Sequence, residues 1–124
     1  MITEDYVSFE TAKLLKEKGF DEPTLWFYVG DGTKLYAHKT AGDDWWRRPT
    51  LQMAMKWLRE VHNLHCAVDY DFVLGWYCQI TSLKETVEYD YEEMKHYHPD
   101  KDNGFSTPEE ACEEAIKYCL ENLV

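Results

Sequence analysis

Two groups of histidine, cysteine and aspartate side chains are the residues of this sequence best suited to chemistry, because all three residue types bind zinc. The first group is His62, His65 and Cys66, at the end of an apolar helical pattern. The second alternates along a polar stretch and consists of His96, His98, Asp100 and Asp102. Neither group has a paired spacing such as CxxC or HExxH. We therefore expect no metal site and no cofactor, with the first two histidines at the edge of a buried helix stripe.

The polar stretch also contains a run that resembles a calcium-binding loop, residues 100–104. If Gly104 is the sixth position of such a loop, Glu110 falls correctly at the twelfth. Pro99 and Lys101 then occupy the first and third positions, which require oxygen ligands. We interpret the run as a solvated turn before a helix.

The four cysteines offer a further kind of chemistry, as nucleophiles or as disulfides: Cys66, Cys78, Cys112 and Cys119. The last two are separated by about 10 Å along one helix, which no disulfide spans. Glutamates at the start of that helix disfavour a reactive thiolate. The N-terminal residues have no export-signal pattern and no segment is apolar enough for a membrane span, so we expect a cytoplasmic protein without membrane contact. Because the cytoplasm is reducing, we expect the four thiols to be free, and mostly buried.

Trp45, Trp46, Arg47 and Arg48 form the most unusual segment, because tryptophan and arginine dominate the hot spots of protein interfaces. Residues 38–48 have no periodicity, which predicts a loop. The four side chains are candidate binding residues, and pinning of the loop to the core is the alternative.

The acidity of the chain is concentrated in its C-terminal third. Residues 83–124 carry a net charge of −8 out of −11 for the whole chain. Such a charge disfavours nucleic-acid binding and favours a partner protein with a basic surface. The candidate contact residues on the terminal helix are Glu109, Glu113 and Glu121. The alternative is that these carboxylates are only solubilising surface charges.

Three segments have the signals of helices. Ser8 is a predicted N-cap, and Gly19 a predicted left-handed stop with Phe20 folding back on the helix. Pro49-Thr50 opens a second helix that ends near Asn63, and Thr107-Pro108 opens a third within a capping box. Periodicity predicts burial for seven residues of the last two helices, with His65 continuing the stripe: Leu51, Ala54, Leu58, Val61, Ile116, Cys119 and Leu120.

Strand patterns fill the intervals between the helices. Residues 25–29 and 35–37 flank a glycine-rich turn and predict a β-hairpin. Alternation over 66–72 and 76–81 predicts a second hairpin with one buried face, and 86–91 predict a third strand beside it. We therefore expect one α+β domain, residues 1–124, with three helices on an antiparallel sheet of four to five strands in the order α-β-β-α-β-β-(β)-α.

Stretches of the three helices resemble small uncharacterised proteins of gut anaerobic bacteria and their phages or mobile elements. The matching residues are 6–10 with 12–20, 49–62 and 109–123. The family has no assigned function, so the resemblance implies a setting and transfers no catalytic residue.

The sequence contains no GxSxG, P-loop or dinucleotide-binding motif. We therefore expect a non-enzymatic accessory protein that acts by binding another protein, through the acidic helix or the segment 45–48. Two alternatives stay open. One is a phage-type regulator or inhibitor that mimics the charge of nucleic acid, and the other is an unrecognised small enzyme, because catalytic groups can assemble from distant segments.

Overall fold

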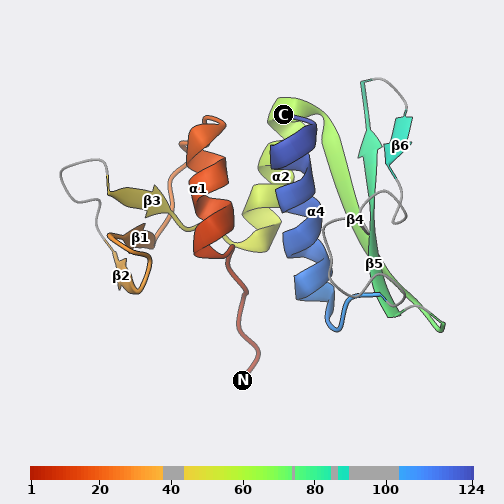
Figure 1. The fold of residues 1–124 in the computed structure, drawn as a ribbon, viewed down its shortest axis with the longest axis horizontal. Helices are drawn as coiled ribbons and strands as arrows, with labels where there is room; N and C mark the ends of the chain where they lie inside the picture. The colour runs from red at the N-terminus through yellow and green to blue at the C-terminus, as the bar shows by residue number, and fades with distance from the viewer. Residues whose placement is uncertain (38–43, 74, 85–86, 90–103) are drawn as a thin grey trace.

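The computed structural model describes residues 1–37, 44–73, 75–84, 87–89 and 104–124. In this part of the chain, three helices stand between two antiparallel sheets (Figure 1). The predicted α+β class and the general order of helices and strands are confirmed. The elements are α1 (Phe9–Glu17), β1 (Phe27–Val29), β2 (Lys34–Tyr36), β3 (Trp45–Arg47), α2 (Leu51–His62), β4 (Leu64–Asp71), β5 (Gly75–Ser82), β6 (Val87–Tyr89) and α4 (Pro108–Asn122).

The helix α1 begins and ends as its sequence predicts. The Ser8 hydroxyl accepts a hydrogen bond from the Thr11 N–H at 3.2 Å, which satisfies one of the free donors of the first turn. Gly19 takes a φ of +95°, and the Phe20 N–H donates to the Leu15 carbonyl at 2.9 Å. Phe20 is thereby returned to the core, where it is buried.

The helix α2 has the predicted caps, and its buried face departs from the prediction at its C-terminal end. Thr50 caps its start and Asn63 ends it with a φ of +58°. His65 lies beyond that end, exposed on β4, so its assignment to the helix stripe was wrong. Val61 was expected to be buried and is 53% exposed, whereas Trp57 is 6% exposed. Periodicity gives the direction of a side chain, and Val61 lies in the last turn of α2, where the neighbouring elements no longer cover that direction.

The helix α4 begins at Pro108 with Thr107 as its N-cap, whose hydroxyl accepts from the Glu110 N–H at 3.1 Å. Its apolar residues Ile116, Cys119 and Leu120 are completely buried. These three predictions are confirmed, as are those for Leu51, Ala54 and Leu58.

The first sheet has the order β2-β1-β3, and its strand β3 corrects the expected loop at residues 45–47. Residues 38–43 of that expected loop lie outside the described residues. Trp45, Trp46 and Arg47 pair with Val29, Tyr28 and Phe27 of β1. Three residues are too few to reveal an alternation, so the strand exists because β1 supplies its hydrogen-bond partners. The turn between β1 and β2 lies against Phe9, because Gly32 has a φ of +85° and its α-carbon approaches that ring too closely for a side chain.

The second sheet has the order β4-β5-β6, so the strands form two sheets where one was expected. Pro49 ends the first sheet, and α2 begins two residues later and carries the chain away from it. The predicted hairpin pairs Leu64 with Ser82 and Asp71 with Gly75. Residues 87–89 of the predicted third strand form β6, and residues 86, 90 and 91 lie outside the described residues.

Burial along this hairpin follows the helices that cover it. Cys66, Cys78 and Ile80 are buried beneath α2 and α4. Tyr70 and Phe72 continue the same alternation and are 51% and 97% exposed, so the expectation of one fully buried face was wrong toward the turn. Figure 1 shows the reason, since the hairpin extends beyond the ends of the helices.

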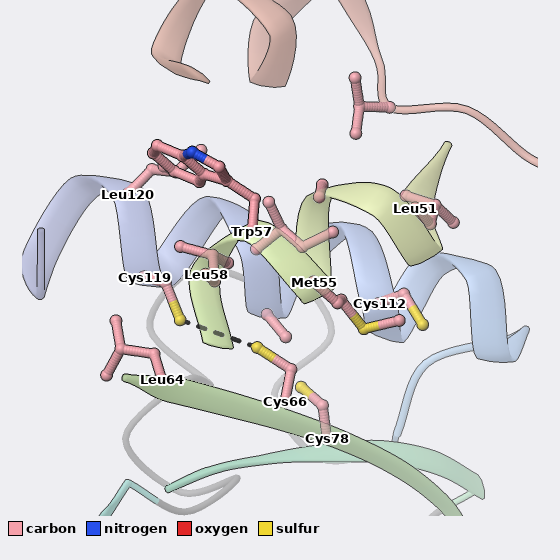
Figure 2. Packing of buried hydrophobic residues seen from close by; sticks show 14 of the residues in the cluster. Leu51, Met55, Trp57, Leu58, Leu64, Cys66, Cys78, Cys112, Cys119 and Leu120 are labelled. Atoms are coloured by element: carbon pink, nitrogen blue, oxygen red, sulfur yellow. Dashed lines mark hydrogen bonds between the residues drawn. The ribbon is translucent and has the colours of Figure 1, made fainter. Parts of the chain in front are cut away.

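The core lies between the helices and the second sheet. Figure 2 shows Cys66 and Cys78 pointing from the strands toward Cys119 of α4, with Leu58 of α2 beside them. The Cys66 and Cys119 sulfurs are 3.9 Å apart. All four cysteines are free and buried, as predicted. Trp57 closes the opposite side of the core, where its ring meets Phe20 edge-on at 5.3 Å.

Replacing Leu58 by alanine tests this description of the core. Leu58 has no exposed surface, so the variant should lose about 2–5 kcal/mol of unfolding free energy. Val61→Ala is the matched control on the same helix and should stay within about 0.5 kcal/mol of the unmodified protein. Chemical denaturation measures both, and equal losses in the two variants would contradict the assigned face.

Candidate protein-binding surface

The two tryptophans of the predicted binding segment are half-buried against α1. Trp46 meets Phe9 edge-on at a ring-centroid distance of 5.0 Å. The Lys16 ammonium lies 4.3 Å from the centre of the Trp45 ring and donates to the Trp45 carbonyl at 2.8 Å. These contacts attach β3 to the helix.

The two arginines of the segment also have partners within the chain. Arg47 donates to Asp21 at 3.0 Å, and Arg48 lies 4.1 Å from the centre of the Tyr6 ring. The depression beside them, between α1 and β3, has a volume of about 180 Å³ and is lined partly by Trp45 and Arg47. The segment therefore has a structural role in joining the first sheet to α1, and its role in binding stays a prediction.

The three candidate glutamates of α4 are not gathered at one place. Glu113 accepts hydrogen bonds from the Thr11 hydroxyl at 2.6 Å and from the Ser8 N–H at 3.0 Å. It therefore neutralises the positive N-terminal end of α1 and joins that helix to α4. Glu109 and Glu121 are exposed, and about 18 Å of helix separates them.

Glu109 lines a groove that the sequence did not reveal. The groove has a volume of about 350 Å³ and lies among the N-terminal segment, the first turns of α2 and α4, and the middle of the β4–β5 hairpin. Its apolar lining consists of Leu51, Val68, Trp76, Pro108 and Cys112, and its polar lining of Thr3, Glu4, Asp5, Thr50, Gln52 and Glu109.

The charge of the groove comes from three carboxylates. Glu4, Asp5 and Glu109 are all exposed, and the described lining residues include no lysine, arginine or histidine. The start of α2 offers little compensating positive charge, because the Leu51 N–H is taken by the Asp5 carbonyl at 3.0 Å. An apolar floor with an acidic rim suits a basic polypeptide segment that carries one apolar side chain.

An aromatic strip continues from the groove toward the hairpin turn. We define it as Tyr70, Phe72 and Trp76. The Tyr70 ring lies 5.1 Å from Trp76 and 6.2 Å from Phe72. The neighbouring Val73 is 86% exposed. Exposed apolar side chains that adjoin a groove mark an interaction surface more strongly than scattered ones do.

The backbone holds Trp76 firmly in this position. Trp76 is paired with Tyr70 of β4 on one side. On the other side, the Phe105 N–H donates to the Trp76 carbonyl at 2.7 Å and the Trp76 N–H donates to the Phe105 carbonyl at 3.3 Å. Phe105 itself is buried. The backbone that carries the indole is therefore already ordered before binding, which favours affinity.

The side chains weighed as potential zinc ligands do not assemble in the part of the chain that the structure describes. His62 packs edge-on against Trp57 at 4.7 Å, and burial lowers the pKa of its imidazole. His65 is exposed on β4, and Cys66 is buried. No group of three side chains that could bind a metal ion occurs among residues 1–37, 44–73, 75–84, 87–89 and 104–124. His96, His98, Asp100 and Asp102, and the calcium-like run, lie outside the described residues.

The cysteines have the properties of core residues. Burial, followed by the neighbouring Cys66, raises the pKa of Cys112 to about 11. Burial also raises the pKa of Cys78 far above its ordinary range. The contact with Cys66, together with burial, raises the pKa of Cys119. Nucleophilic catalysis needs the thiolate, so these three thiols are unsuited to it.

Comparison with family models, with curated proteins and with solved structures finds no match for this chain. The resemblance of its helices to small proteins of gut anaerobes and their phages stays a prediction. None of the helices that the structure describes is long and apolar enough to cross a membrane.

Glu113→Ala tests the structural role of this glutamate. The variant leaves the buried Thr11 hydroxyl without its acceptor, so it should lose about 1–3 kcal/mol of unfolding free energy. Glu121→Ala removes an exposed charge from the same helix and should change stability by less than about 0.5 kcal/mol. Thermal and chemical denaturation measure the difference, and an unchanged Glu113→Ala variant would contradict the proposed link between α1 and α4.

Thiol labelling tests the state of the cysteines. A pKa of about 11 for Cys112, raised from 9.0, leaves about a hundredfold less thiolate at pH 8 than an ordinary thiol has. Labelling of Cys112, Cys78 and Cys119 in the folded protein should therefore be slow and should accelerate in denaturant. Rapid stoichiometric labelling of Cys112 at pH 8, located by mass spectrometry, would refute this assignment.

Proposed function

We propose that this protein acts by binding another protein, and that it seats a basic segment of that partner in the groove beside Glu109. The observation that carries the proposal is the union of an apolar floor, formed by Leu51, Val68 and Trp76, with the rim carboxylates of Glu4, Asp5 and Glu109. The aromatic strip enlarges the apolar surface on one side. An apolar side chain of the partner enters the groove, and its basic neighbours meet the rim.

The charge of the chain favours the same class of partner. The net charge of −11 attracts a basic protein over long range and repels nucleic acid. The segment 45–48 is the weaker candidate surface, because the contacts of Trp45, Trp46, Arg47 and Arg48 within the chain already use much of their surface.

A panel of synthetic peptides tests the proposal. Each peptide carries one leucine or tryptophan flanked by arginines and lysines, and a matched set has glutamates in their place. Basic peptides should shift the amide NMR signals of Leu51, Val68 and Trp76, and binding should weaken as salt is added. The acidic set should leave the spectrum unchanged.

Two triple variants of equal charge locate the site. Glu4→Gln, Asp5→Asn and Glu109→Gln together should weaken peptide binding at least about threefold. Glu17→Gln, Glu60→Gln and Glu121→Gln together should leave it nearly unchanged. Equally weakened peptide binding in both variants, or amide NMR shifts confined to the C-terminal half of α4, would contradict binding in the groove. Either result would favour a diffuse acidic surface of the kind that mimics nucleic-acid charge. Shifts confined to β3 would move the site to Trp45 and Trp46.

A further inference from the structure

The strand β4 forms one edge of the second sheet, and its backbone groups alternate in direction. The Asn63 carbonyl accepts from the Leu83 N–H at 2.8 Å. The backbone N–H and C=O groups of Asn63 and of the odd-numbered residues after it therefore point toward β5. The even-numbered residues Leu64, Cys66, Val68 and Tyr70 therefore direct their N–H and C=O groups outward. Of the described strands, none lies on that side.

We propose that two copies of this protein pair through β4, antiparallel and about a two-fold axis at Ala67. In this register Cys66 faces Val68 of the second copy, and Leu64 faces Tyr70 of the second copy. All these residues have outward backbone groups, so they form the hydrogen-bonded pairs of the new ladder. The β4-β5-β6 sheets of the two copies then become one continuous sheet across the dimer.

The side chains at the axis fit this register. Ala67 faces its own copy in a non-hydrogen-bonded pair, where the α-carbons are only about 4.5 Å apart, and its small side chain leaves room for the larger side chains on either side of it. Ala67 is exposed, and it lies on the face of the sheet away from the helices, as its neighbours His65 and Asp69 do.

The polar side chains beside the axis are also complementary, because an imidazole can donate a hydrogen bond to a carboxylate. His65 and Asp69 are both exposed, and the register places His65 of each copy opposite Asp69 of the other, so that the pair occurs twice. The Asp69 carboxylate now accepts from the Tyr70 N–H at 2.8 Å. In the dimer that N–H passes to the Leu64 carbonyl of the second copy, which frees Asp69 to bind the facing imidazole.

The same two side chains select a register from among the alternatives. A shift by one hydrogen-bonded pair, with the axis at Val68, places Asp69 opposite Ala67 and His65 opposite Asp71. The Asp71 carboxylate already accepts from the Val73 N–H at 2.7 Å in the hairpin turn. The axis at Ala67 therefore gives both His65–Asp69 pairs without disturbing that turn. The dimer uses the sheet edge and does not depend on the function proposed for the groove.

Exchanging the side chains at positions 65 and 69 for charged ones tests the pairing. Analytical ultracentrifugation at up to about 1 mM protein measures the dimer dissociation constant. Asp69→Lys and His65→Asp each place like or unmatched charges opposite one another, so each should raise the dimer dissociation constant at least about tenfold. The double variant restores opposite charges and should recover the dimer. Glu17→Lys changes the net charge as Asp69→Lys does, on α1, and should have no effect.

Cross-linking tests the register itself. Ala67→Cys should form a covalent dimer with oxidised glutathione, because the two cysteines face each other at the axis. Glu17→Cys is the exposed control and should not. A monomer at every concentration, a dimer insensitive to the charge exchange, or equal cross-linking at both positions would overturn the proposal.

Discussion

The complete burial of one face of α4 is the constraint on which the rest of the structure depends. Ile116, Cys119 and Leu120 have no exposed surface, and no single neighbour of α4 can cover them all. The helices α1 and α2 and the strands β4 and β5 all pack against α4. Glu113 fixes the first of these contacts, because its carboxylate binds the N-terminal end of α1.

This arrangement also explains where the molecule leaves apolar surface exposed. The helices cover the part of the β4–β5 hairpin that contains Cys66, Cys78 and Ile80. The hairpin is longer than the face that they cover (Figure 1). Val68 and Trp76 therefore line an open groove, and Tyr70 and Phe72 project beyond it. The candidate binding surface is the uncovered continuation of the core.

Sequence reasoning succeeded where a signal is local. Ser8, Gly19, Asn63 and Thr107 end or begin helices through their own backbone and side-chain chemistry, and the structure has them in those positions. It was less successful where burial depends on how far a neighbour extends. Val61 and Phe72 have the right periodicity, but they lie past the ends of the elements that would cover them. The strand β3 could not be predicted because it depends on pairing with β1, which comes sixteen residues or more earlier in the chain.

The candidate site was only partly predictable for the same reason. Glu109 was identified from charge, but Glu4 and Asp5 are far from it in sequence and meet it only when α2 and α4 bring their first turns together. Glu113 has the same residue type as Glu109 and a different role, which only its contact with Thr11 reveals. The alternation over Val68, Tyr70 and Phe72 was the available signal for the groove and its strip. It was interpreted as core because a sequence does not show where the helices end.

The most direct test of the account is site-specific photo-cross-linking in cells of the native host. The photoreactive amino acid p-benzoylphenylalanine is placed at Phe72, at the end of the aromatic strip, and in a second protein at Trp45 of β3. The protein labelled at Phe72 should form a discrete adduct with a basic protein. The Glu4→Gln, Asp5→Asn, Glu109→Gln variant should lose this adduct. An adduct at Trp45 with none at Phe72 would contradict the account, and so would an adduct at Phe72 that the three rim substitutions leave unchanged.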